Sequence, residues 1–213
     1  MITRRRLLQT SAPLAAGLGL LGVGVAPAAA QGAYDMTEML KPGPLPEMSL
    51  GKADAPITII EYASMTCIHC AHFHETVFPY LKQKYIDTGK VRMIYREFPL
   101  DPLAAAASML IRCSPQDKFF ELVGLFNEKR DTWISQSKPV EALANFSKQI
   151  GFTEQTFKTC ITDQKLFDSL NEVRNRGSEV FKIDGTPTFF VNGRKSVGLG
   201  TKEELDKALE PFL

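Results

Sequence analysis

Hydrophobic and polar residues change their spacing between residues 55 and 100, and each change predicts a new element. The stretch APITIIEYAS, residues 55–64, is rich in β-branched and aromatic residues, which is typical of a buried strand. Residues 70–87 place apolar side chains at helical spacing, at Phe73, Val77, Leu81 and Tyr85. Pro79 within this helix predicts a kink. Residues 90–100 alternate and predict a second strand, so a helix connects two parallel strands.

The spacing is helical from residue 102 to about residue 182 and then returns to strands. TPTFFVNG, residues 186–193, predicts a strand that ends in an Asn-Gly hairpin turn. RKSVGLG pairs back onto it, and TKEELDKALEPF forms a closing helix. Residues 31–53 carry three prolines and few apolar residues in register, so we expect an irregular lead-in there. The chain therefore reads as an α/β domain with a block of helices in its middle.

The first 30 residues predict an export signal. Three arginines without any acidic residue precede an apolar run, and Ala28 and Ala30 form a cleavage pattern before Gln31. The apolar run is short and rich in Gly and Ala, which favours a cleaved signal over a retained membrane anchor. The twin-arginine and general secretory routes both fit the arginines at Arg4 and Arg5. We therefore expect the mature protein in the periplasm.

Removal of residues 1–30 changes the charge balance of the 213-residue chain. It leaves 183 residues, with 22 of the 25 basic residues and all 24 acidic ones. No basic tract remains, so the sequence argues against a nucleic-acid partner. The remaining length suits one domain with an insertion.

Two of the four cysteines and all three histidines lie within MTCIHCAHFH, residues 65–74. Cys67 follows a predicted strand and begins a predicted helix, where unpaired backbone N–H groups and the helix dipole stabilise a thiolate. Cys70 lies about one turn further on, close enough to form a disulfide with Cys67. His69 lies between them and can add an imidazolium beside the thiolate. A Cys-x-x-Cys pair between a strand and a helix is typical of thioredoxin-like redox sites.

Other chemistry for this cluster is less well supported. Covalent haem attachment requires a histidine where Ala71 stands. A structural zinc site requires four ligands, and Cys67, Cys70 and His74 supply three. We therefore expect no resident metal, and we interpret His72 and His74 as ordinary residues of the first helical turns. No Gly-rich phosphate loop is present, so we expect no bound cofactor.

Three segments of the chain resemble those of the DsbA-type thiol:disulfide oxidases: EYASMTCIHC, YREFPL and GTPTFFVNG. The resemblance covers about residues 53–213. It implies a thioredoxin-like fold, over residues 54–213, with an inserted all-helical subdomain at about residues 102–163. It also implies that Cys67 is the nucleophile, that Cys70 is the buried resolving thiol, and that His69 stabilises the thiolate.

The resemblance assigns roles to three more residues. Thr186 and Pro187 match the cis-proline loop that contacts substrate, and a proline at the start of a strand fits a bend or an edge. Glu61, six residues before Cys67, matches a buried acid that helps proton transfer; the alternative is an exposed acid on a strand. Ile68 and Thr186 depart from the family, which often has proline and valine there. Thr-Pro also occurs in isomerases and reductases of this fold.

Cys113 and Cys160 lie in the helical block, 47 positions apart. The resemblance implies a second, non-catalytic disulfide between them; the alternative is two buried free thiols, which an oxidising compartment disfavours. The expected partners are reduced exported proteins and a membrane quinone-linked reoxidase of the DsbB type. We expect a monomer, because residues 31–53 are too short for a separate dimerisation domain. A disulfide isomerase or reductase of the same fold and a periplasmic metal-binding adaptor are the alternatives.

Overall fold

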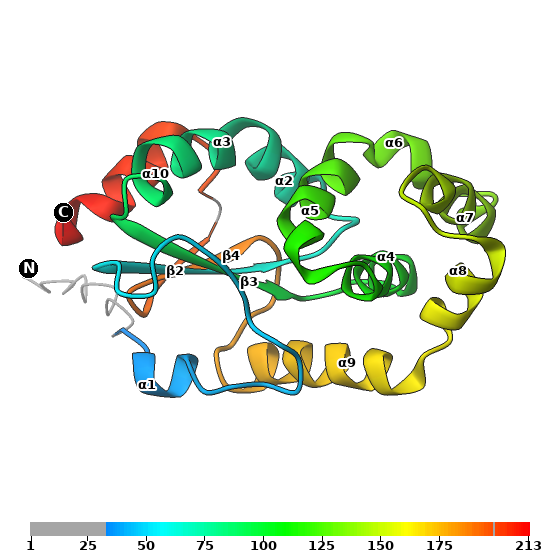
Figure 1. The fold of residues 1–213 in the computed structure, drawn as a ribbon. Helices are drawn as coiled ribbons and strands as arrows, with labels where there is room; N and C mark the ends of the chain where they lie inside the picture. Colours follow the sequence, from blue (N-terminus) through cyan, green and yellow to red (C-terminus); the bar gives the residue numbers. More distant parts are fainter. Residues whose placement is uncertain (1–32, 198) are drawn as a thin grey trace, which may run out of the picture. The chain divides into compact units, whose positions relative to one another are not determined.

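A five-stranded mixed sheet forms the centre of the fold in the computed structural model, which describes residues 33–197 and 199–213 (Figure 1). The sheet order is β1-β3-β2-β4-β5. Its strands are β1 (Met48–Leu50), β2 (Ile57–Ala63), β3 (Val91–Glu97), β4 (Thr188–Val191) and β5 (Arg194–Val197). The strands β2 and β3 are parallel, as predicted, and the other neighbouring pairs are antiparallel. The predicted export signal at residues 1–30 lies outside the described residues.

The helix after β2 alternates between α and π turns. Its parts are α2 (Ile68–His72), η1 (Phe73–Val77), α3 (Phe78–Leu81) and η2 (Lys82–Ile86), of which η1 and η2 are π-helical. Pro79 has no N–H and cannot continue the regular hydrogen-bond ladder, and a wide π turn directly precedes α3. This irregular turn carries His74.

Five helices follow β3 before the long helix that returns to the sheet. They are α4 (Pro102–Cys113), α5 (Phe119–Glu128), α6 (Arg130–Trp133), α7 (Pro139–Gln149) and α8 (Glu154–Ile161), with a short 3₁₀ turn at Gln116–Lys118. The next helix is α9 (Gln164–Glu179), and the chain closes with α10 (Lys202–Leu209) and a 3₁₀ turn at Glu210–Phe212. Figure 1 shows α4 to α8 beside one end of the sheet.

Helices cover both faces of the sheet. The first face packs against α3 and α10 through a cluster that includes Ile59, Leu81 and Leu205. The second face packs against α1 (Met36–Met39) and the segment after α9, through Tyr62 and Phe190 among others. Burial of each such side chain contributes roughly 1.5–3 kcal/mol to stability. Packing on both faces therefore holds β2 and its carboxyl end in place. No helix of the described residues has the length and apolarity needed to cross a membrane.

The prediction of an irregular segment over residues 31–53 is wrong in two places. Residues Met36–Met39 form α1, and Met48–Leu50 form β1, which pairs antiparallel with β3. Glu47, just before β1, pairs with Arg92 and Arg96 of β3. The strand is only three residues long, so it leaves no measurable alternation in the sequence, and its partner strand determines that it forms.

The predicted hairpin turn after β4 is confirmed. Asn192 and Gly193 connect β4 to β5, and both have positive φ, at 44° and 82°. Positive φ at both central residues is the requirement of a two-residue turn whose twist matches that of the strands. This hairpin holds β4 in register beside β2, with Glu61 opposite Phe189 and Tyr62 opposite Thr188.

Candidate active site

Cys67 lies at the junction between β2 and α2. It is the N-cap residue of α2, with extended backbone angles, and its thiol is partly exposed. Cys70 lies one turn further along α2 and is completely buried. Both are free thiols in the structure. The accessible sulfur of Cys67 and the inaccessible sulfur of Cys70 therefore lie at the same helix terminus.

The surroundings of Cys67 strongly favour its thiolate. Its pKa is lowered from 9.0 to about 5, first by a hydrogen bond from the Cys70 side chain, against the opposing effect of burial. The nearby Thr186 side chain and the backbone N–H groups of Cys70 and His69 lower it further. These groups act together because a helix N-terminus leaves its first N–H groups unpaired.

Cys70 has the opposite electrostatic environment. Burial is the main cause that raises the pKa of the Cys70 thiol, and its hydrogen bond to Cys67 and the charge of Glu61 raise it further. At neutral pH the pair therefore holds one thiolate at Cys67 and one neutral thiol at Cys70, which donates a hydrogen bond to it. Such asymmetry separates the two sulfurs into an attacking group and a proton-bearing group.

The loop before β4 reaches Cys67 from a distant part of the sequence. The Thr186–Pro187 peptide bond is cis. The thiol of Cys67 donates to the Thr186 carbonyl oxygen at 3.2 Å. The Thr186 hydroxyl is buried and has no partner among the described residues, so it can donate to Cys67 once the thiol becomes a thiolate. The structure thus brings Cys67, Cys70, Thr186 and Pro187 together, as the resemblance implies.

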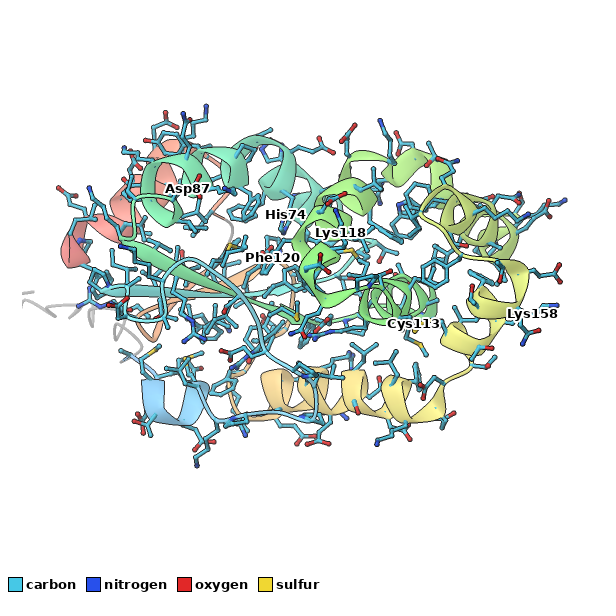
Figure 2. The ribbon with its side chains drawn as sticks, viewed as in Figure 1. His74, Asp87, Cys113, Lys118, Phe120 and Lys158 are labelled. Atoms are coloured by element: carbon cyan, nitrogen blue, oxygen red, sulfur yellow. A yellow bond between two sulfur atoms is a disulfide. The ribbon has the colours of Figure 1, made fainter. Side chains whose placement is uncertain are left out.

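Glu61 of β2 is fully buried, which excludes the exposed-acid interpretation, whereas its role in proton transfer stays a prediction. Its carboxylate oxygens lie 3.1 and 3.0 Å from Nε2 of His74, and the two side chains are 0% and 2% exposed. Figure 2 labels His74 where the helix after β2 faces the sheet. His74 therefore lies inside the protein and pairs with a buried acid, which its interpretation as an ordinary residue of the helix did not specify.

A signal for His74 was present in the sequence. Cys70, His74, Val77 and Leu81 repeat at spacings of four, three and four, which places them on one helix face. Cys70, Val77 and Leu81 are apolar and buried, so the fourth member of the set is buried with them. His72 lies off this face, is exposed, and has Nε2 3.1 Å from the Gly200 carbonyl oxygen.

His69 is also exposed. Its backbone N–H is among the main causes of the lowered Cys67 pKa, whereas its imidazole is not one of them. The stabilising role of the His69 imidazole therefore stays a prediction.

Helices of the inserted block hold the loop that contains Cys67. Arg130 of α6 donates to the Thr66 carbonyl oxygen at 2.8 Å, and the Thr66 hydroxyl donates to Asp101 at 2.5 Å. Asp101 also caps α4 by accepting from the N–H of Ala104. The helical block is thus hydrogen-bonded directly to the active-site loop.

Cys113 at the end of α4 and Cys160 in α8 form a disulfide, with their Cα atoms 6.2 Å apart (Cys113 is labelled in Figure 2). Cys160 is buried in the cluster that also contains Trp133 and Phe157. The bond ties two helices of the block together. It lies in a different part of the chain from the Cys67–Cys70 pair and shares no residue with it.

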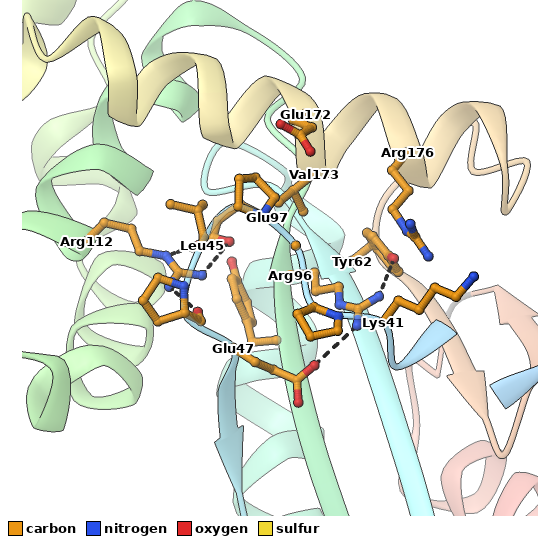
Figure 3. A pocket seen from close by; sticks show the side chains of 15 residues that line it. Lys41, Leu45, Glu47, Tyr62, Arg96, Glu97, Arg112, Glu172, Val173 and Arg176 are labelled. Carbon is orange, nitrogen blue, oxygen red and sulfur yellow. Dashed lines mark hydrogen bonds and ion pairs between the residues drawn. The ribbon is translucent and has the colours of Figure 1, made fainter. Parts of the chain in front are cut away.

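A separate cavity of about 70 Å³ lies between residues 41–47 and α9 (Figure 3). Its charged side chains are largely paired, because Arg112 binds Glu97 and Arg96 binds Glu47. Neither Cys67 nor Cys70 lines it. Within residues 33–197 and 199–213, no group of three or more His, Cys, Asp and Glu side chains is placed to hold a metal ion.

The chain is similar to known proteins over most of its length. Residues 45–211 match the family model described as Thioredoxin. The chain is 37% identical over 168 residues to a putative protein-disulfide oxidoreductase of Rickettsia bellii, which covers 77% of this chain and 65% of that protein. It is 31% identical over 157 residues to a probable disulfide bond formation protein D of Bacillus anthracis, which covers 69% of this chain and 70% of that protein.

The structure also matches solved structures of this group. It aligns with Wolbachia pipientis alpha-DsbA1 at a TM-score of 0.74 and 32% identity, over 84% of this chain and 96% of that one. The chain therefore belongs to the thioredoxin family, and within it to the DsbA-like protein-disulfide oxidoreductases. The predicted fold class, a thioredoxin-like fold with a helical insertion, is confirmed. The chain spans less than two thirds of the length of the Rickettsia relatives.

Proposed function

We propose that the protein introduces disulfides into exported proteins through the Cys67–Cys70 pair. The observation that carries this proposal is the opposite shift of the two thiols: the Cys67 pKa is lowered to about 5 and the Cys70 pKa is raised. A stabilised thiolate favours the reduced form of the pair. It therefore makes the oxidised form a stronger oxidant and Cys67 a better leaving group.

In the first step a substrate thiolate attacks the Cys67 sulfur of the oxidised pair. The Cys67–Cys70 bond breaks, a mixed disulfide forms at Cys67, and Cys70 leaves and takes up a proton. A second substrate thiolate then attacks the substrate sulfur of the mixed disulfide. Cys67 leaves as a thiolate, the substrate gains a disulfide, and the two electrons remain on the Cys67–Cys70 dithiol.

The loop of Thr186 and Pro187 is the proposed substrate contact in these steps. It lies against Cys67, with the Thr186 carbonyl oxygen 3.2 Å from the Cys67 sulfur. A peptide that joins to Cys67 must therefore pass along this loop. Thr186 also adjusts the pair, because its side chain helps to lower the Cys67 pKa.

Several parts of the proposal concern the surroundings of the protein. Residues 1–30 are the export signal, the compartment is the periplasm, and the working form is a monomer. Reduced exported proteins are the substrates. Each turnover leaves a dithiol, so a partner must remove two electrons, and a membrane quinone-linked reoxidase of the DsbB type supplies that reaction.

The reduction potential tests the direction of the reaction. Equilibration with glutathione at several ratios, followed by alkylation and mass analysis, gives the oxidised fraction of the pair. A value near about −120 mV, as in DsbA, supports oxidation of substrates, and one near about −270 mV, as in thioredoxin, would contradict it in favour of a reductase. An intermediate value near about −180 mV with refolding of scrambled disulfides would favour an isomerase.

A further inference from the structure

In the contact between Glu61 and His74, the histidine donates the hydrogen bond and the carboxylate accepts it. An ionised carboxylate only accepts hydrogen bonds, and both its oxygens lie within 3.1 Å of His74 Nε2. Nε2 must therefore carry the hydrogen and share it between the two oxygens. This geometry fixes the rotamer of Glu61 and directs the Nε2 hydrogen of His74 between its two oxygens.

The pair lies in apolar surroundings. The ring of His74 contacts Phe73 and Phe78 of the helix, with centroids 5.4 and 5.2 Å away, and Tyr95 of β3 at 6.0 Å. Tyr95 is also the residue opposite Glu61 in the parallel register. A carboxylate buried in such a place needs a hydrogen-bond donor, and the N–H of His74 supplies it.

The titratable groups that face this carboxylate come from three elements. Cys70 of α2 lies near enough for its pKa to respond to the charge of Glu61, His74 of η1 binds the carboxylate, Tyr95 of β3 lies opposite it, and the residue opposite on β4 is the apolar Phe189. The charge of Glu61 contributes to the raised pKa of Cys70 and also to that of Tyr95, for which burial is the larger cause. The Glu61 carboxylate therefore acts on the sulfur of Cys70, which must lose its proton before it can attack a mixed disulfide at Cys67.

We propose that His74 is a positioning residue that holds Glu61 as a carboxylate facing Cys70, so that Cys70 can lose its proton and resolve a mixed disulfide at Cys67. The inference rests on the proposed function and concerns one step of it. The Cys70 thiol passes its proton to the Glu61 carboxylate, and the resulting Cys70 thiolate attacks the Cys67 sulfur. The Cys67–Cys70 bond forms, the bond from Cys67 to the other thiol breaks, and that thiol leaves with both electrons of the broken bond.

Release of a coloured thiol isolates this step. Reduced protein is treated with the disulfide of 5-thio-2-nitrobenzoate, and release of the second coloured thiolate by Cys70 is followed in a single turnover from about pH 5 to about pH 9. His74→Phe removes the N–H and keeps an aromatic ring among Phe73, Phe78 and Tyr95. His74→Gln restores an N–H donor, and His72→Gln is the matched control on the same helix.

We expect His74→Phe to slow release at neutral pH by about tenfold or more, because a hydrogen bond to a charged group is typically worth at least that factor. Its rate should rise more steeply with pH than that of the wild type, since hydroxide must replace the carboxylate as proton acceptor. His74→Gln should recover most of the rate, and His72→Gln should match the wild type. The Cys67 thiolate absorbance should titrate alike in every variant, because Glu61 is not among the main causes of the Cys67 shift.

Two results would overturn the inference. One is a wild-type rate and pH profile in His74→Phe. The other is an equal loss in His74→Phe and His74→Gln with an unchanged pH profile, which would make His74 a packing residue. If His74→Phe does not fold, His74→Leu serves with the same expectations. Failure of wild-type protein to release the second thiol would instead contradict the proposed function.

Discussion

The sulfur of Cys67 lies 3.2 Å from the carbonyl oxygen of Thr186, although 119 residues separate them. This contact exists because β4 pairs antiparallel with β2, which brings the loop before β4 next to the residues that follow β2. The pairing therefore places a fixed backbone oxygen and an unpartnered hydroxyl beside the more reactive sulfur. The first predictions concern the chemistry of that sulfur.

Cys67→Ala and Cys70→Ala should fail in different ways. Cys67→Ala removes the thiolate and should abolish oxidation of a dithiol peptide, since buried Cys70 cannot reach a substrate. Cys70→Ala keeps the thiolate and should accumulate mixed disulfides with substrates, which non-reducing gels and mass spectrometry detect. Full turnover by Cys70→Ala would contradict the two-cysteine mechanism.

His69→Ser tests the contribution of an exposed imidazole. Serine keeps the backbone N–H that lowers the Cys67 pKa and removes the side-chain cation. We expect the pKa of Cys67 to rise, the reduction potential to fall and substrate oxidation to slow without loss of fold. A tenfold change in the redox equilibrium corresponds to about 30 mV. Ultraviolet absorbance of the thiolate against pH measures the shift of the Cys67 pKa. An unchanged pKa would show that the helix terminus and the residues around it lower the Cys67 pKa without the His69 imidazole.

The stability of the reduced protein should depend on pH through Cys67. Its pKa is about 5 in the folded chain against an ordinary 9.0, so its contribution is complete above the higher value and is lost as the pH falls through about 5. The oxidised protein has no Cys67 thiol and lacks this contribution. The reduced form should therefore gain stability relative to the oxidised form as the pH rises from about 5 to about 8, below the range in which Cys70 titrates.

Thermal unfolding of both redox forms at several pH values checks this prediction. Cys67→Ala is the control, because its stability should show no such rise. A difference between reduced and oxidised protein that stays constant across the range would contradict the assigned Cys67 thiolate.

The Cys113–Cys160 disulfide should stabilise the fold without serving the reaction. Replacement of both cysteines by alanine opens a loop of 47 residues, and we expect a loss of ~3–4 kcal/mol in the chain-entropy model. Denaturant unfolding with the Cys67–Cys70 pair reduced measures this loss of stability.

In the wild type, alkylation after denaturation should leave Cys113 and Cys160 unlabelled when only the Cys67–Cys70 pair has been mildly reduced. Labelling of both would show that the bond is absent in solution.

Local sequence determines the parts of this protein that depend on neighbouring residues. A β-branched run predicts β2, helical spacing predicts the helix after it, and the Cys-x-x-Cys pair at their junction predicts a stabilised thiolate. Asn192 and Gly193 determine their turn, because few other residues adopt positive φ there. Such features need no knowledge of distant segments.

Tertiary structure alone decides the rest. β1 is three residues long and forms because it pairs with β3. It is too short for its own sequence to show the alternation of a strand. Glu61 and His74 are 13 residues apart on a strand and a helix, and their contact depends on how that helix packs against the sheet and on the face to which β2 turns Glu61. A buried charge needs a partner, and only packing decides which residue supplies it.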